Sequence, residues 1–248
     1  MKIQGMTLIE ILVAMLLSSL MAAALVHYYL YSKINYRDDE QQVNRVIDSL
    51  WTATLLRQDL QKAGFTPCQS LQTLHSLDRR KIDTQALKAI TVIQSPLPQL
   101  QIQYMDAHYA TLLTRISGQQ FVVETDSRWQ NGDGLLIADC DHAEVHTLKS
   151  IHYYGQQARI GLLNAPLTAF KPPIYVGQWI EKRWSIRPLK NGQMALFHGS
   201  AAREEEISNE IDRLQVTWLQ SHPEPLLEII LGKGNKELQH FSVWLRNL

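Results

Sequence analysis

The chain has 248 residues, of which 45% are apolar and 19% are charged. Its 24 basic residues balance its 24 acidic residues, so the formal net charge is zero. This composition is typical of a folded globular protein and excludes a disordered or collagen-like chain. The balanced charge gives no reason to expect direct contact with a nucleic acid. The two cysteines, Cys68 and Cys140, are too few for a zinc ribbon or a disulfide-dense scaffold.

One segment near the N-terminus departs strongly from these averages. Residues 11–26 are apolar except for two serines. With the apolar residues on either side, the segment reaches the length of roughly 20 residues that spans a bilayer. Between Met6 and Tyr31 the only side chain ionised at neutral pH is Glu10. The sequence therefore predicts a membrane-spanning helix that carries a single carboxylate near its start.

Three interpretations of this apolar segment compete. A secretory signal peptide would have Lys2 as its basic start and residues 22–24, which are three alanines, as its cleavage site. An ordinary membrane anchor, or a prepilin leader cut after Gly5, would instead keep the apolar helix. Glu10 favours the prepilin, because a carboxylate in an apolar span costs about 2.5–3.5 kcal/mol and is usually functional. The stretch from Thr7 to Glu10 also matches a helix capping box, which explains the spacing but not the apolar surroundings.

The decapeptide Gly5-Met6-Thr7-Leu8-Ile9-Glu10-Ile11-Leu12-Val13-Ala14 resembles the start of type IV prepilins and pseudopilins. That family shows Gly, a hydrophobic residue (more often Phe than Met), Thr-Leu-(Ile/Leu)-Glu, and then an apolar helix. The resemblance implies that a prepilin peptidase cleaves between Gly5 and Met6 and methylates the new amino group of Met6. Glu10 would pair with the terminal amine of a neighbouring subunit, because a buried carboxylate needs a partner. It would be an assembly residue and not a catalytic one.

The absence of glycine and proline between Met6 and Ala63 predicts one unbroken helix over residues 6–64. Its first part, residues 6–31, is expected to form the transmembrane segment and the filament core. Its second part carries an apolar stripe at helical spacing, which predicts a face that packs on the following domain. The stripe consists of Val43, Val46, Ile47, Leu50, Trp51 and Leu55. Gly64 is expected to end the helix.

Short runs rich in Val, Ile, Tyr and Trp follow from about residue 90, which predicts a β-rich head over residues 65–248. Asn191-Gly192 predicts a hairpin turn. Residues 201–211, with three consecutive glutamates, could be a short helix or a loop. The candidate strands are residues 90–94, 100–105, 111–116, 121–124, 135–138, 145–153, 159–163, 175–187, 194–198, 214–219, 226–231 and 241–245. The predicted fold class is α+β, with the long helix packed on an antiparallel sheet, as the resemblance to type IV pilins also implies.

Two segments of the head resemble one branch of the pilin class, the PilW-type minor pilins. Residues 55–65, followed by Cys68, are similar to that family's L-R-x-D-(I/L)-x-x-A-G-(F/Y) stretch and nearby cysteine. Residues 132–140 are similar to its G-D-x-(L/V)-x-(I/V)-x-(D/N)-C segment. If the head lies outside the cytoplasm, Cys68 and Cys140 meet oxidising conditions and a disulfide would tie the helix end to the sheet; two buried free thiols remain the alternative. The GspJ-type pseudopilins of type II secretion share the more generic features.

No other constellation predicts catalysis or a cofactor. His142, Glu144 and His146 would share one face of a strand, as metal ligands can, but polar residues on a wet strand face explain them equally well. Residues 204–206, three glutamates, are expected to be a solvated face. Five tryptophans are expected in the core or on sheet faces: Trp129, Trp179, Trp184, Trp218 and Trp244. No enzymatic activity, metal or cofactor is expected.

These observations predict a three-part chain: a leader over residues 1–5, the helix over residues 6–64, and the head over residues 65–248. The expected function is that of a PilW-like minor pilin that primes or supports pilus assembly within a tip complex, or else of a GspJ-like minor pseudopilin. The expected location is the bacterial inner membrane, with the head in the periplasm, and then the pilus. Expected partners are the prepilin peptidase, other minor pilins, the major pilin and a tip adhesin. A secreted enzyme with an ordinary signal peptide is the unrelated alternative.

Overall fold

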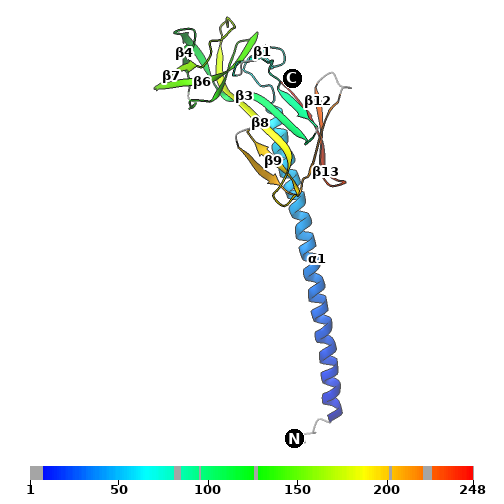
Figure 1. The fold of residues 1–248 in the computed structure, drawn as a ribbon. Coiled ribbons are helices and arrows are strands. Elements are labelled where there is room, and N and C mark those ends of the chain that lie inside the picture. Colours follow the sequence, from blue (N-terminus) through cyan, green and yellow to red (C-terminus); the bar gives the residue numbers. More distant parts are fainter. Residues whose placement is uncertain are drawn as a thin grey trace. The chain divides into compact units, whose positions relative to one another are not determined.

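The computed structural model describes residues 8–80, 85–94, 96–125, 128–200, 203–219 and 225–247 (Figure 1). The chain forms two compact units, the first ending at Asp48 and the second beginning at Ser49. The helix α1 (Leu8–Lys62) contributes to both units, and its last turns belong to the second. All strands of the described residues lie in the second unit, which we call the head. The predicted class, a long helix combined with antiparallel sheet, is confirmed.

The helix α1 is unbroken over 55 residues, as the lack of glycine and proline predicts. Gly64 follows it with a φ of 70°, the left-handed conformation that suits glycine after a helix. The N–H of Gly64 does not return to the helix but donates to the carbonyl of Gln103 at 2.9 Å. Phe65 then accepts a hydrogen bond from the N–H of Met105 at 3.0 Å. The end of α1 is therefore fixed directly to the sheet.

Ten strands form the large sheet of the head and three form a separate sheet. The large sheet contains β1 (His75–Asp78), β2 (Ile90–Ile93), β3 (Gln99–Arg115), β4 (Gln120–Glu124), β5 (Gly134–Ala138), β6 (His142–Tyr154), β7 (Gln157–Leu162), β8 (Tyr175–Pro188), β9 (Met194–Gly199) and β10 (Glu204–Ser208). The three-stranded sheet contains β11 (Arg213–Leu219), β12 (Leu226–Lys233) and β13 (Lys236–Trp244).

Part of the large sheet closes on itself. The pairings run from β3 to β4, β7, β6, β5 and β8, and β8 pairs again with β3. These six strands thus form a closed ring, which leaves no free edge among them. Its interior is filled by apolar residues that include Phe121, Leu135, Ile160 and Val176. The other halves of β3 and β8 continue outside the ring as a more open sheet with β2, β9 and β10.

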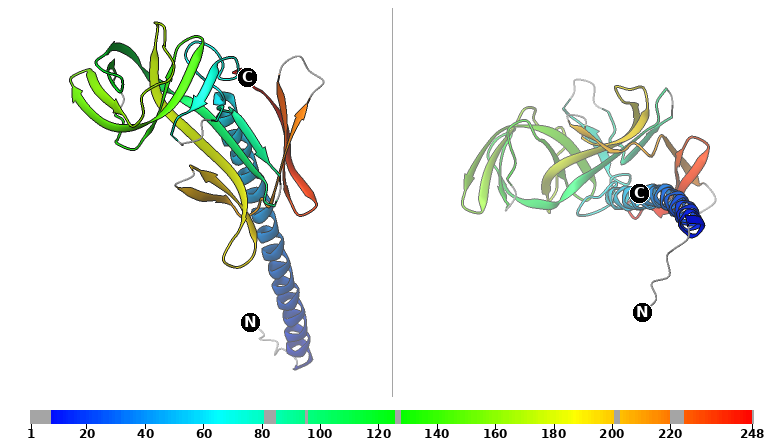
Figure 2. Two further views of the ribbon diagram at one scale, coloured as in Figure 1. Left: turned by 45° about the horizontal axis from the view of Figure 1, so that its top comes forward. Right: turned by 90° about the horizontal axis from the view of Figure 1, so that it is seen from below.

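The open part of the large sheet and the three-stranded sheet share a core with the end of α1 (Figure 2). Leu56 and Leu60 of α1 are fully buried there, with Trp184 of β8 and Ile229 of β12. At roughly 25 cal/mol per Å² of buried apolar area, such residues each contribute about 1.5–3 kcal/mol. This shared core holds the last turns of α1 within the head.

Three elements differ from the sequence-based predictions. The runs at 100–105 and 111–116 belong to one strand, β3, which bulges between Met105 and Tyr109. The segment predicted as a short helix or loop contains β10, because its glutamates can alternate along the edge of a sheet and reach solvent or arginines. The strand β1 was not predicted. It is short and pairs in parallel with β6, so it has no hairpin signal in the sequence.

The tryptophans occupy core and sheet-face positions. Trp129, Trp179 and Trp184 are buried. Trp218 and Trp244 lie on β11 and β13 and remain partly exposed. Trp218 pairs with Leu227 and Trp244 pairs with the preceding residue, Leu226, so the two indoles point to opposite faces. They do not form a joint aromatic platform.

Candidate functional site: the helix and its attachment to the head

The apolar segment at the start of the chain forms the beginning of α1. Glu10 lies in the first helical turn, where a carboxylate interacts favourably with the helix dipole. An 18-residue window of α1 has a mean hydropathy of 2.3, so the helix is long and apolar enough to cross a membrane. Gly5 and Met6, between which cleavage is predicted, and Thr7 of the capping box lie outside the described residues.

Within the head, the apolar stripe on the second part of α1 remains largely exposed, which corrects the prediction for that part of the helix. Leu50 and Trp51 are 51% and 55% exposed, and only Leu55 at the end of the stripe packs partly against the core. The residues exposed along the stripe are Val43, Val46, Ile47, Leu50 and Trp51. We call these five residues the exposed stripe. Contiguous exposed apolar residues of this kind mark surfaces for protein or membrane contact.

A different face of α1 turns toward the head and contains smaller or polar side chains. Its buried residues are Ser49, Thr52, Ala53, Leu56, Asp59 and Leu60. Small residues permit close approach of the helix to the strands, while the two leucines supply most of the apolar area. The periodicity of large apolar residues therefore indicated the wrong face, because the residues that pack on the sheet are not the largest ones.

Asp59 is the charged residue on this packing face. Its Oδ2 accepts a hydrogen bond from Nε1 of Trp184 at 3.0 Å and lies 2.8 Å from Nε2 of His198. The rings of Trp184 and His198 are stacked at a tilt, with centroids 4.3 Å apart. These contacts join α1 to β8 and β9 in the interior of the head. Sequence reasoning missed this role of Asp59, although its placement between Leu56 and Leu60 on one helical face was a usable signal.

The segment that follows α1 is joined to the sheet by a disulfide. Cys68 and Cys140 are bonded, with their Cα atoms 5.3 Å apart. Beside this bond, the N–H of His75 donates to the carbonyl of Asp141, and β1 begins its pairing with β6. The structure thus contains the bridged form, not the pair of free thiols.

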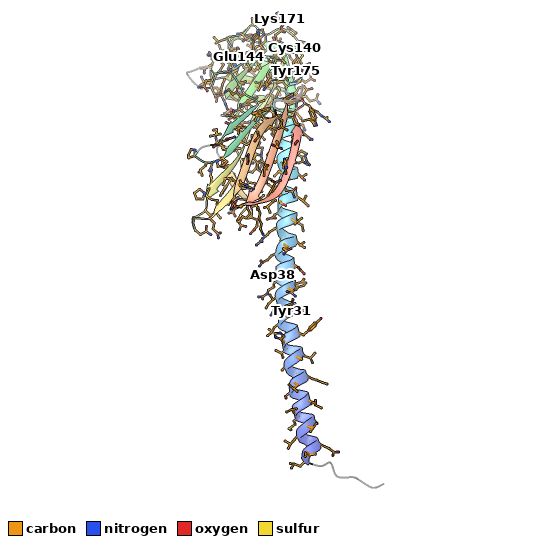
Figure 3. The ribbon with its side chains drawn as sticks, turned by 90° about the vertical axis from the view of Figure 1, so that its right-hand side faces the viewer. Tyr31, Asp38, Cys140, Glu144, Lys171 and Tyr175 are labelled. Carbon is orange, nitrogen blue, oxygen red and sulfur yellow. A yellow bond between two sulfur atoms is a disulfide. The ribbon has the colours of Figure 1, made fainter. Side chains whose placement is uncertain are left out.

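Two buried carboxylates hold residues 163–174, the loop between β7 and β8, against β6. Glu144 accepts hydrogen bonds from the N–H groups of Leu167 and Thr168 and lies 3.0 Å from Nε2 of His146. Burial opposes the ionised carboxylate, but these hydrogen bonds outweigh it and lower the pKa of Glu144 to about 2. Cys140, Glu144 and Lys171 lie at the same end of the head (Figure 3).

Asp139, the residue before Cys140, supports the same loop. Its Oδ1 accepts from the N–H groups of Asp141 and His142, and its Oδ2 accepts from the N–H of Lys171. These donors lower the pKa of Asp139 below its ordinary value although the group is buried. The acidic residue beside the cysteine therefore has a structural role, because it turns the chain into β6 and fixes the loop.

The three polar residues of β6 that could have been metal ligands or a wet strand face have a different arrangement in the structure. His142, Glu144 and His146 share one face of the strand, but Glu144 and His146 are fully buried and bonded to each other, so the face is not wet. Within the residues that the structure describes, no group of three or more His, Cys, Asp and Glu side chains could hold a metal ion.

The three glutamates at 204–206 differ in their exposure to solvent. Glu204 is largely buried and forms ion pairs with Arg183 and Arg187 of β8, which corrects its assignment to a solvated face. Glu205 and Glu206 are exposed on β10. The ion pairs of Glu204 hold the edge strand β10 across β9 to β8.

Comparison with known proteins identifies the N-terminal segment. Residues 1–26 match the family described as the prokaryotic N-terminal methylation motif. No curated protein and no solved structure matches the chain. The motif, followed by an apolar helix and an antiparallel head, indicates a type IV pilin-like or pseudopilin protein. It implies processing by a prepilin peptidase and association with pilus components.

Proposed function

We propose that this chain is a minor type IV pilin of the PilW type that primes or supports assembly of the pilus. The observation that carries the proposal is the match of residues 1–26 to the methylation motif, continued by an apolar helix with Glu10 in its first turn. Cleavage would fall between Gly5 and Met6, and Met6 would be N-methylated. The mature chain would be held in the inner membrane by residues 6–31, with the head in the periplasm, until it enters the pilus.

Assembly would then depend on binding and not on catalysis. Glu10 would pair with the N-terminal amine of a neighbouring subunit, because the ionised forms of both groups are costly in an apolar environment unless they are paired. The exposed stripe supports this proposal, since its five large apolar side chains are exposed on α1 and available to a partner. Partners would be other minor pilins, the major pilin and a tip adhesin.

The PilW assignment rests on the two resembling segments of the head. Their acidic residues, Asp59 and Asp139, are buried and bonded, and the two cysteines form a disulfide. These residues therefore stabilise the head, which would explain why pilins with this type of head share them. The second candidate is a GspJ-like minor pseudopilin of a type II secretion system. The methylation motif and the apolar helix are equally compatible with that role.

Cross-linking in the cell separates the two candidates. A photoreactive residue in place of Trp51, in the exposed stripe, should capture neighbouring subunits during assembly. Cross-links to pilins of a type IV pilus support the minor-pilin proposal, and cross-links to pseudopilins support the second candidate. The same residue placed at Gln41, which is exposed on another face of α1, is the matched control. Absence of cross-links from position 51 to either class would contradict both.

A further inference from the structure

A cavity of about 350 Å³ lies where the end of α1 meets β3, β8 and the C-terminal segment. Its lining includes Lys62, Phe65, Tyr104 and Lys182, and all of its lining residues belong to the head. The cavity exists because the β3–β8 register jumps from the pair Met105–Trp179 to the pair Tyr109–Gly177. Three residues of β3 face one residue of β8 across this jump, so β3 bulges away from its neighbour.

The walls of the cavity are fixed by hydrogen bonds. Met105 donates its N–H to the carbonyl of Phe65 at 3.0 Å, which holds the helix end on β3. Oδ1 of Asp106 accepts from the N–H of His108 at 3.2 Å, which stabilises the bulge. Asn247 donates from Nδ2 to the carbonyl of Gln61 at 3.2 Å and closes the side near the C-terminus. A preformed cavity of this size, with apolar walls and a few polar groups, is typical of a small-ligand site.

Tyr104 gives the cavity a hydrogen-bond donor. The residue is only 7% exposed and lines the cavity, so its phenol ring is held in place at the cavity wall. Burial and the nearby charges of Asp59 and Asp106 raise the pKa of Tyr104 well above its ordinary value. The hydroxyl therefore keeps its proton and donates.

The charges of the residues that line the cavity favour an anionic ligand. Lys62 and Lys182 both line the cavity, and no ion pair joins either of them to another described residue. Among the described lining residues, Lys62 and Lys182 are the cations and Asp106 is the one acid, so this described part of the lining carries one net positive charge. Two ammonium groups and a phenolic O–H are all donors, and a carboxylate can accept from all three. Phe65 and Ile180 provide an apolar wall beside them.

We propose that this cavity binds a monocarboxylate that carries a short apolar group, supplied either as a free small acid or as the C-terminal residue of a polypeptide. The carboxylate lies between Lys62 and Lys182 and accepts from the Tyr104 hydroxyl. The apolar group lies against Phe65 and Ile180. This site is independent of the proposed role of the chain in pilus assembly, because it uses neither Glu10 nor the exposed stripe.

Equilibrium dialysis with the full-length chain in detergent micelles tests the proposal. The probes are 3-phenylpropionate and N-acetyl-glycyl-phenylalanine, which represent the free acid and the chain terminus, and their neutral amides measure partition into micelles. We expect each acid to bind at least tenfold more tightly than its amide. The acid that binds more tightly identifies the source of the ligand.

Variants assign the binding to the cavity. Tyr104→Phe keeps the ring and should weaken binding of the acids several-fold, and the double variant Lys62→Gln/Lys182→Gln should weaken it at least tenfold. Lys149→Gln, at an exposed lysine outside the cavity, is the matched control and should bind as the unchanged chain does. Equal binding of acids and amides, or acid binding that is unchanged in both cavity variants, would overturn the proposal.

Discussion

Nε1 of Trp184 donates a hydrogen bond of 3.0 Å to Oδ2 of Asp59, which links β8 to α1 inside the head. The same oxygen lies 2.8 Å from Nε2 of His198 on β9. A carboxylate on the packing face of a helix is costly to bury, and here both nitrogen donors offset the cost. The contact fixes the rotation of the last helical turns, so that Leu56 and Leu60 face the core and Trp51 remains exposed.

Asp59→Ala should lower the free energy of unfolding of the head by about 2–4 kcal/mol, because it leaves the buried indole N–H and the imidazole without their acceptor. Asp59→Asn should cost less, since its amide oxygen can still accept from Trp184. Denaturant titration followed by near-ultraviolet circular dichroism measures both. Gln58→Ala, at the neighbouring exposed position, should change stability by no more than about 0.5 kcal/mol. Equal stability of Asp59→Ala and Gln58→Ala would contradict this role.

The sequence predicted the elements that depend on local signals. The unbroken helix followed from the lack of glycine and proline up to Ala63, and the β8–β9 hairpin followed from Asn191-Gly192, where Gly192 has a φ of 80°. It did not predict the ring closed by β3 and β8. That pairing joins residues such as Ala110 and Val176, which are far apart in the chain, and local periodicity contains no information about it.

The candidate site was predictable only in part, for a related reason. Glu10 stands out because a charge in an apolar run is visible in the sequence itself. The buried states of Glu144 and Glu204 depend on partners from distant segments, so the sequence indicated solvated side chains. The orientation of α1 was mistaken because large apolar residues such as Trp51 are usually buried, whereas in this chain they form an exposed surface.

Acid should destabilise the head through Glu144. Its pKa is about 2 in the folded chain, below the ordinary value of 4.5, so ionised Glu144 stabilises the fold at higher pH. This contribution, on the order of 3 kcal/mol, should be fully present above about pH 5 and should be lost as the pH falls toward 2. Asp139, whose pKa is also lowered, should contribute with the same sign.

Glu144→Gln tests this assignment. The variant should be less stable at pH 7, and its stability should fall less steeply between pH 5 and pH 2, as measured by denaturant titration at each pH. Hydrogen-exchange measurements should show faster exchange of the N–H groups of Leu167 and Thr168, because these groups donate hydrogen bonds to Glu144 in the folded chain. Glu124→Gln, at an exposed glutamate of β4, is the control. A pH profile of Glu144→Gln that matches that of the unchanged chain would rule out this role.

The exposed stripe should matter for assembly and not for folding. Leu50→Asn and Trp51→Gln should change the free energy of unfolding by no more than about 0.5 kcal/mol, because both side chains are largely exposed. On the proposed function, the same variants should reduce incorporation of the chain into filaments several-fold. Quantitative immunoblots of sheared filaments measure incorporation, with Gln41→Asn, on another exposed face of α1, as the control. Normal incorporation of both variants would show that the stripe is not an assembly surface.

Glu10→Ala should still insert into the membrane, since it removes a charge from an apolar segment. If Glu10 pairs with the amine of a neighbouring subunit, the variant should enter filaments poorly, because that amine would then have no partner. Ser18→Ala, elsewhere in the apolar part of α1, should be incorporated normally. Membrane fractionation and the yield in sheared filaments separate insertion from assembly. Incorporation of Glu10→Ala at the level of Ser18→Ala would remove the pairing role.

Mass spectrometry of the mature N-terminus tests the central claim most directly. The proposed function predicts a chain that begins at Met6, carries one methyl group on its amino nitrogen and retains the whole of α1. Loss of the prepilin peptidase should leave residues 1–5 attached and the amine unmethylated. A mature chain that begins near Leu25, with the apolar segment removed, would instead show a secreted protein and would contradict the assignment as a pilin subunit.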